Sequence, residues 1–251
     1  MPDAILVINA GSSSLKFSLY GVGAQGADAL SLQIKGEIEG IGTSPHFTAE
    51  DGAGAVLVDR RWQDDQRSDH AKFFRVVYDW LHEREGHLVA VGHRVVHGGA
   101  ELTAPVLIDE AVMRQLEDLC PLAPLHQPHN LAGIRAVAAV QPDLPQVACF
   151  DTAFHRGHPE VADRFALPRA LHDQGIRRYG FHGLSYEYIA RTLPEVAPEI
   201  AQGRVVVAHL GNGASMCALQ AGRSIDSTMS FTALDGLVMG TRCGALDPGV
   251  V

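Results

Sequence analysis

One stretch near the start of the chain, residues 5 to 20 with the sequence ILVINAGSSSLKFSLY, restricts the fold more than any other. Residues 5 to 8 are a short apolar run rich in β-branched side chains, as expected of a strand buried on both faces. Residues 15 to 20 then alternate between apolar and polar side chains, which is typical of a half-buried strand. Gly11 lies between them, where a glycine allows backbone conformations closed to other residues and a close approach to the main chain. The stretch therefore predicts a strand, a tight turn and a second strand.

The turn itself carries small residues with clustered hydrogen-bond donors. Ser12, Ser13 and Ser14 follow Gly11, and Lys16 comes soon after them. A concave turn of backbone N–H groups, hydroxyls and one cation can hold phosphate oxygens. The alternative is an ordinary polar hairpin, because serine-rich turns are common and short motifs match by chance. The turn alone leaves both interpretations open.

Charge and composition exclude some classes of protein. The 251 residues carry a formal net charge of −9, so the chain lacks the basic surface of a nucleic-acid-binding protein and must hold any anionic ligand locally. No apolar run approaches the ~18 residues of a membrane span, and the chain begins without a basic leader. We therefore expect a cytoplasmic protein that contacts neither nucleic acid nor membrane. The four cysteines form no C-x-x-C pair, which argues against a disulfide framework and a zinc site.

The rest of the first half passes from an antiparallel meander into alternating strands and helices. The expected elements are strands at residues 31 to 39 and 54 to 59, a helix at 69 to 84, a strand at 88 to 91, helices at 109 to 119 and 128 to 140, and a strand at 146 to 150. Pro128 suits the first turn of its helix. Asp151 follows the last of these strands, and strand ends are where α/β sheets usually place their chemistry.

The opening pattern recurs in the second half, after a helix expected at residues 185 to 193. In residues 204 to 222 an apolar run leads into Gly211, Asn212 and Gly213, and a second apolar strand follows. The likeness to the opening hairpin favours a duplicated domain in which both halves hold phosphates. Coincidence is the alternative, because Asn-Gly is a very common hairpin turn.

Three loops combine charged and small residues in ways that a plain scaffold would not need. They are GHRVVHGG at 92 to 99, FDTAFHRG followed by RRYGFHG within 150 to 183, and GLVMGTRCGALDP at 236 to 248. Arg94 lies in GHRVVHGG and Arg242 in GLVMGTRCGALDP. An arginine on such a loop suits bidentate binding of carboxylate or phosphate, whereas a single one would be interpreted as a surface salt bridge. Two of them beside two phosphate-type turns favour an anion site. His182, in YGFHG, can hydrogen-bond a transferring phosphoryl group, and His126 is the next candidate. No helical pair of histidines with a third ligand suggests zinc.

Six motifs, in this order, resemble those of the acetate kinase family, which comprises acetate and propionate kinases within the sugar kinase, heat-shock protein 70 and actin superfamily. They are VINAGSSSLKF, GHRVVHGG, FDTAFH, RYGFHG, HLGNGAS and the MGTR loop, and together they cover the whole chain. The resemblance implies an α/β fold with two ribonuclease H-like (actin-like ATPase) domains, whose mixed sheets are flanked by helices. The domains would be residues 1 to 150 and 151 to 251, with the second incomplete. ATP and acetate would bind in the cleft between them, and the protein would be a homodimer.

The resemblance also implies roles for individual residues. The implied catalytic residues are Arg94, Asp151, His182 and Arg242. The implied nucleotide-binding residues are Ser12, Ser14, Lys16, His209, Gly211, Asn212 and Gly213. Arg94 and His126 would contact acetate or acetyl phosphate, and Asn9 would lie at the metal. The implied metal is Mg²⁺, with Mn²⁺ as an alternative, and ATP or ADP is the co-substrate.

The sequence departs from the family pattern in three places. The motif usually written GFHGTSH reads GFHGLSY, with Leu184 and Tyr186, and the usual GTRSGDIDP reads GTRCGALDP, with Cys243 and Ala245. Family members are also longer. We therefore expect that the glycine-rich adenosine-binding segment, a glutamate associated with Mg²⁺ and the terminal helices are missing, and that the isolated chain is inactive.

The chemistry implied is a reversible, direct in-line phosphoryl transfer between ATP and acetate, giving acetyl phosphate and ADP. Acetate is ionised at pH 7 and needs no general base, so the obstacle is charge repulsion, which cations and donors can reduce. Propionate is an equally suitable substrate on sequence grounds. Another alternative is a sugar or polyol kinase, in which Asp151 would deprotonate a hydroxyl, although two arginines argue against a neutral substrate. The last is a non-enzymatic, nucleotide-dependent switch.

Overall fold

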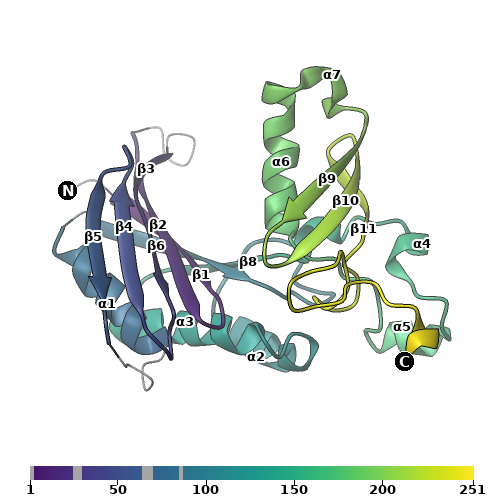
Figure 1. Ribbon diagram of the computed structural model, residues 1–251, viewed down its shortest axis with the longest axis horizontal. Helices are drawn as coiled ribbons and strands as arrows, with labels where there is room; N and C mark the ends of the chain where they lie inside the picture. The colour runs from purple at the N-terminus through teal and green to yellow at the C-terminus, as the bar shows by residue number, and fades with distance from the viewer. Residues whose placement is uncertain (1–2, 25–29, 64–69, 85–86) are drawn as a thin grey trace. The chain divides into compact units, whose positions relative to one another are not determined.

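The computed structural model describes residues 3–24, 30–63, 70–84 and 87–251 (Figure 1). The chain divides into two compact units. The first comprises Met1–Val95, Val106–Cys120 and Pro124–Ala148, and the second comprises Val96–Pro105, Pro121–Ala123 and Cys149–Val251. The domain limits at residues 150 and 151 stay a prediction.

The first unit is built on an eight-stranded mixed sheet with the strand order β5-β4-β3-β2-β1-β6-β8-β7 (Figure 1). The strands are β1 Asp3–Ala10, β2 Ser14–Val22, β3 Leu30–Glu39, β4 His46–Asp51, β5 Val56–Arg61, β6 His87–Val95, β7 Val106–Leu107 and β8 Gln146–Phe150. Strands β1 to β5 form the expected antiparallel meander, and β6 pairs in parallel with β1. The change from antiparallel to parallel pairing thus occurs at β1, the strand that leads into the first turn.

Helices cover one face of this sheet. Helix α1 (His70–His82) and helix α3 (Gln127–Val140) contact each other and the sheet, and α2 (Glu110–Asp118) packs on α3. Alternation along β1 directs Leu6 and Ile8 into the core, where both are buried. Val7, on the opposite face, is 39% exposed, so the expectation that this strand is buried on both faces was wrong. Among the described residues the helices pack on one face of the sheet only. The apolar run at the start of β1 therefore lies in a strand whose other face is open.

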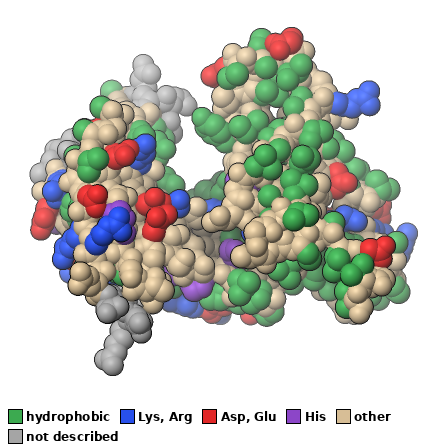
Figure 2. Space-filling model, in the orientation of Figure 1, with side chains coloured by type: hydrophobic (Ala, Val, Ile, Leu, Met, Phe, Trp, Pro, Cys, Tyr) green, Lys and Arg blue, Asp and Glu red, His purple; other side chains and the backbone are tan. Residues whose placement is uncertain are grey.

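The second unit contains a three-stranded antiparallel sheet in the order β11-β10-β9. Its elements are the 3₁₀ helix η3 Ala153–His155, α4 Glu160–Asp163, α5 Arg169–Asp173, α6 Gly183–Val196, α7 Pro198–Ala201, β9 Arg204–Leu210, β10 Ala214–Gln220, β11 Arg223–Ser227 and the 3₁₀ helix η4 Pro248–Val250. A further 3₁₀ helix, η2 Cys120–Leu122, has its first residue in the first unit and the others in the second. A small core joins Tyr186 of α6 to Cys217 and Leu219 of β10. The opposite face of β9 carries exposed Val206 and Leu210, and Figure 2 shows that hydrophobic side chains gather over this unit.

Most predicted elements are present, but the strands β4, β7 and β11 and the short helices α4, α5 and α7 were not predicted. The helices expected at residues 109 to 119, 128 to 140 and 185 to 193 are confirmed, and so is the helix at 69 to 84, whose first residue lies outside the described part of the chain. Strand β4 was missed because its ends carry turn-forming residues, and β11 because it is short and polar. No helix among the described residues has the length and apolar character needed to cross a membrane.

Candidate active site

The first turn of the chain is held in place by the two helices beneath it. The N–H of Gly11 donates to the carbonyl of Ser14 at 2.9 Å and closes the turn. The Nε2 atom of His70, at the start of α1, donates to the carbonyl of Gly11 at 2.6 Å. The Nδ2 atom of Asn130, in the first turn of α3, donates to the carbonyl of Ala10 at 2.8 Å. Both carbonyls are thereby fixed, and the position of the turn depends on contacts distant in sequence.

Gly11 is required because little space is left for a side chain at this position. It has no positive φ, so the expectation of an unusual backbone conformation was wrong. A Cβ at this position would lie 3.0 Å from the hydroxyl oxygen of Ser14, so the expected close approach is confirmed. Ser12 and Ser13 are exposed at the tip of the turn. Binding of phosphate by this turn stays a prediction.

A row of polar side chains crosses the open face of the first sheet next to the turn. Cross-strand pairing aligns Asn9 with Lys16 and Lys16 with Glu37. Arg94, on β6, donates from Nη1 to the amide oxygen of Asn9 at 3.0 Å. The Lys16 ammonium lies 2.8 Å from the Glu37 carboxylate, and this hydrogen bond raises the pKa of Lys16. The structure thus joins Arg94 to Asn9, and it gives the expected phosphate-binding lysine a carboxylate partner.

His126 lies at the N-cap position of α3 and is half-buried. Its side chain makes no capping hydrogen bond, and Pro128 occupies the first turn of the helix, as expected. His126 thus precedes by one turn the residue that holds the Ala10 carbonyl.

In the second unit, His182 is surrounded by residues from the other candidate motifs. It begins α6 with φ 59°, in the left-handed region that non-glycine residues seldom occupy. Its Nδ1 atom lies 2.8 Å from the hydroxyl oxygen of Ser215, and the ring of His209 stacks on its ring at 4.1 Å between centroids. A Cβ on Gly213 would lie only 2.7 Å from Nε2, so the imidazole can occupy this place only over a glycine.

Arg242 lies beside the same turn. Its Nη1 atom donates to the carbonyl of Ala233 at 2.5 Å, and its Nη2 atom donates to the carbonyl of Asn212 at 3.0 Å. A Cβ on Gly213 would also come within 3.2 Å of Nη2. The structure therefore brings Arg242 and His182 together above Gly213, two residues that are far apart in the sequence.

Asp151 follows β8 and is buried, with 2% of its surface exposed. Its carbonyl accepts a hydrogen bond from the N–H of Gly183 at 2.8 Å. A Cβ on Gly183 would lie 2.2 Å from that carbonyl oxygen, so the glycine after His182 is required for this contact. The end of β8 is thus tied to the start of α6.

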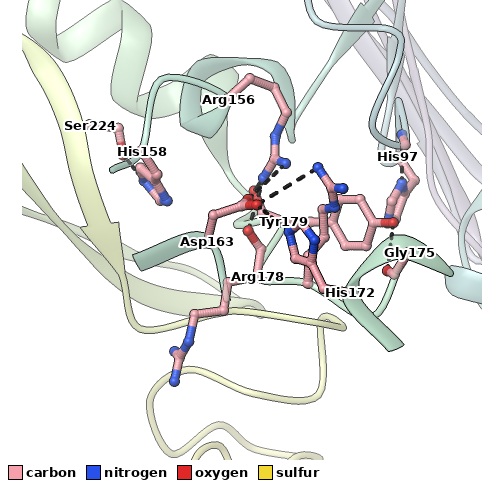
Figure 3. Close-up of polar contacts among 11 residues, drawn as sticks. His97, Arg156, His158, Asp163, His172, Gly175, Arg178, Tyr179 and Ser224 are labelled. Atoms are coloured by element: carbon pink, nitrogen blue, oxygen red, sulfur yellow. Dashed lines mark hydrogen bonds and ion pairs between the residues drawn. The ribbon is translucent and has the colours of Figure 1, made fainter. Parts of the chain in front are cut away.

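Much of the histidine- and arginine-rich loop before His182 forms a scaffold (Figure 3). The carboxylate of Asp163 lies 3.3 Å from Arg156, 3.0 Å from His172 and 3.7 Å from Arg177. Arg156 also donates to the carbonyl of Tyr179 at 2.6 Å. The sequence suggested that the charges of this loop serve chemistry. These contacts instead connect the two ends of the loop, because the loop has too little regular secondary structure to keep its conformation without them.

Two further histidines of this unit, His97 and His155, are fully buried. Burial lowers the pKa of His97 to about 4 and that of His155 to about 3, and the nearby Arg156 contributes to both shifts. Sequence reasoning missed the roles of His70, Asn130 and Ser215, because no local pattern marks a side chain whose partner is distant in the sequence.

Comparison with known proteins identifies the family. The sequence model of the Acetokinase family matches residues 4–251. The chain belongs to the acetokinase family. An acetate kinase of Nitrobacter hamburgensis is 58% identical over 250 residues, which cover 99% of this chain and 61% of that protein.

Solved structures of the acetokinase family agree with this assignment. A propionate kinase from Francisella tularensis matches with a TM-score of 0.87 and 37% identity, covering 99% of this chain and 62% of that one. The acetate kinase of Porphyromonas gingivalis matches with a TM-score of 0.80 and 35% identity, again over 99% and 62%. The fold is thus the α/β, actin-like ATPase fold of this family. The chain spans 61% to 64% of the length of four curated relatives that are 53% to 58% identical to it.

Proposed function

We propose that this chain supplies residues for reversible phosphoryl transfer between ATP and acetate, giving acetyl phosphate and ADP. The observation that carries the proposal is the placement of His182 and Arg242 above Gly213 in a chain of the acetokinase family. A cation and an imidazole side by side suit a group that carries charge on several oxygens. Acetate is the preferred acceptor in this proposal because the curated relatives at 45% to 58% identity are named acetate kinases.

The chain's own residues would act by neutralising negative charge. The acetate carboxylate is already ionised at neutral pH and must approach a polyanionic phosphate. We assign Arg94 and Arg242 to the substrate carboxylate and the transferring phosphoryl group, with His126 as a further substrate contact. His182 would donate a hydrogen bond to the phosphoryl oxygens. In-line attack by the carboxylate then forms the new O–P bond as the bond to ADP breaks.

The remaining candidates would hold the nucleotide. Ser12, Ser14 and the hairpin turn around Asn212 offer hydroxyl and N–H donors, and the His209 ring lies beside that turn. Lys16 can leave Glu37 for a phosphate oxygen, because a half-exposed ion pair of this kind contributes only ~0–1 kcal/mol to stability.

The donor set suits a magnesium ion held largely by nucleotide phosphates. Mg²⁺ typically takes one or two protein carboxylates and keeps several waters. Asp151 offers such a carboxylate, and no cluster of three histidine, cysteine or acidic side chains lies among the described residues. Asn9 has a second lone pair on the amide oxygen that accepts from Arg94, so it stays a proposed contact to the metal. Bound Mg²⁺, or Mn²⁺ in its place, would neutralise phosphate charge. Cytoplasmic location and a homodimer are likewise proposals, which rest on the resemblance to the family.

Hydroxylamine trapping of acetyl phosphate tests the activity. Because the chain spans 61% of the Nitrobacter hamburgensis enzyme, the assay is run on the chain and on a chimera that adds the remaining residues of that enzyme. We expect ATP-, acetate- and Mg²⁺-dependent hydroxamate from the chimera, with propionate a poorer acceptor and glycerol giving no ADP. A chimera that folds and binds ATP but forms no hydroxamate would refute the proposal. Sedimentation of the same chimera tests the homodimer.

A further inference from the structure

Two buried hydroxyl groups lie behind His182. The Ser215 oxygen is 2.8 Å from Nδ1 of His182 and 2.5 Å from the phenol oxygen of Tyr186. Ser215 comes from β10 and Tyr186 from the first turn of α6, and both are 0% exposed. Tyr186 is also one of the positions at which the sequence departs from the family pattern. One serine thus links a tyrosine that water does not reach to the imidazole of the candidate site.

The hydrogen bonds that link Tyr186, Ser215 and His182 run in one direction. A backbone hydrogen bond from His209 lowers the pKa of Tyr186. Only a donor to the phenol oxygen has this effect, because it stabilises the ionised phenol, so the phenol oxygen accepts from the backbone N–H of His209. The phenol nevertheless keeps its proton, because burial raises the pKa of Tyr186 to about 12. Tyr186 therefore donates to Ser215, and Ser215 gives its one proton to Nδ1 of His182.

The reverse direction is less favourable. If Nδ1 of His182 carried the proton and donated to Ser215, then Ser215 would donate to Tyr186. The phenol proton would then have no acceptor among the contacts that the structure describes for Tyr186, in a fully buried position. A buried donor without a partner is destabilising, so this direction is disfavoured.

The other nitrogen of His182 faces the candidate site. Nε2 lies over Gly213, and the Nη2 atom of Arg242 approaches the same glycine. The stacked ring of His209 restricts rotation of the imidazole. The ring is thus fixed by one contact at Nδ1, one against its face and one beneath Nε2.

We infer that Tyr186 and Ser215 are positioning residues that hold neutral His182 as the Nε2–H tautomer, with a hydrogen-bond donor beside Arg242. The identity of the acceptor, a transferring phosphoryl oxygen, rests on the proposed function, whereas the tautomer does not. In this tautomer the neutral ring can donate to an anion through Nε2. Tyr186 stands where the family's motif usually has a histidine.

Nuclear magnetic resonance of nitrogen-15-labelled histidine tests the tautomer on the chain itself. The His182 signals are assigned by their loss in His182→Gln. At pH 7.5 we expect Nε2 protonated and Nδ1 unprotonated in the wild type. Tyr186→Phe, which removes only the hydroxyl, and Ser215→Ala should each give a mixture of tautomers while circular dichroism stays unchanged.

A neighbouring serine provides the matched control. The Ser185 hydroxyl lies 3.0 Å from Nδ1 of His209, and the Ser185 backbone N–H donates to the His182 carbonyl at 3.0 Å. Ser185→Ala keeps the backbone contact, so it should leave the His182 tautomer unchanged. Protonated Nδ1 in the wild type would overturn the inference. So would an unchanged tautomer in both Tyr186→Phe and Ser215→Ala.

Turnover separates this inference from the proposed function. In the chimera described above, Tyr186→Phe should lower kcat about 10-fold while KM for acetate changes less than about twofold, because orientation matters mainly in the transition state. If the wild-type chimera is inactive but the tautomer is as expected, the proposed function fails and the positioning of His182 stands. If the chimera is active and Tyr186→Phe keeps its kcat, the positioning role is refuted.

Discussion

Lowering the pH from 7 to 5 should reduce the free energy of unfolding of the second unit by about 4 kcal/mol, through His97 and His155. Both side chains are fully buried, and their pKa values lie near 4 and 3 because burial disfavours the charged ring. Nδ1 of His97 accepts a hydrogen bond from the N–H of Gly99 at 2.9 Å. Nε2 of His155 donates to the carbonyl of Phe181 at 2.9 Å. Each ring is therefore neutral in the folded state.

The sign follows from proton binding. The unfolded histidines have a pKa near 6.5, so below this pH the unfolded state binds more protons than the folded state. The stabilisation is fully present above about pH 6.5 and is lost as the pH falls toward the folded values near 4 and 3. Each pH unit in this range corresponds to about 1.4 kcal/mol per histidine, which gives about 2 kcal/mol for each between pH 7 and 5. The sum is a large share of the 5–15 kcal/mol typical of a domain.

Urea unfolding at pH 7 and pH 5, followed by far-ultraviolet circular dichroism, measures the loss. His155→Met removes one titrating group at similar volume. It should be less stable than the wild type at pH 7, because two hydrogen bonds are lost, yet it should lose about 2 kcal/mol less between the two pH values. His87→Gln, at a side chain that is 72% exposed, is the control and should keep the wild-type pH dependence. An identical loss in His155→Met and the wild type would refute the reasoning.

Three further changes test the candidate site in the chimera. Arg242→Ala should lower turnover ~10²- to 10³-fold with a much smaller change in ATP affinity, measured by hydroxamate formation and calorimetry, and full turnover would remove Arg242 from the mechanism. Gly213→Ala should displace the His182 ring, lower turnover and shift the His182 resonances, whereas Gly240→Ala, where a Cβ meets nothing within 4 Å, should leave those resonances in place. Asp151→Asn should keep the circular dichroism spectrum while lowering activity and Mg²⁺ dependence together, and loss of folding would indicate a structural role.

Local sequence patterns were sufficient to predict most helices and strands and to select the candidate site residues. Apolar runs joined by glycine-containing turns predicted both hairpins, and helical spacing predicted α1 and α2. These predictions succeed because the pattern that forms an element lies within it. The ordered motifs were also enough to indicate the family that the sequence comparison then confirmed. Short strands such as β4 escaped because turn-forming residues surround them.

The partners of these residues were decided by tertiary structure. The sequence proposed Lys16 as a phosphate ligand, but only the register of β2 on β3 places Glu37 against its ammonium. It marked the arginine-rich loop as a site for chemistry, but the fold brings Asp163 to Arg156. It noted Tyr186 only as a departure, whereas the packing of α6 on β10 places that phenol against Ser215 and, through it, behind His182. Hydrogen bonds and ion pairs form between groups that are close in space, and for residues distant in sequence that closeness depends on how the whole unit packs.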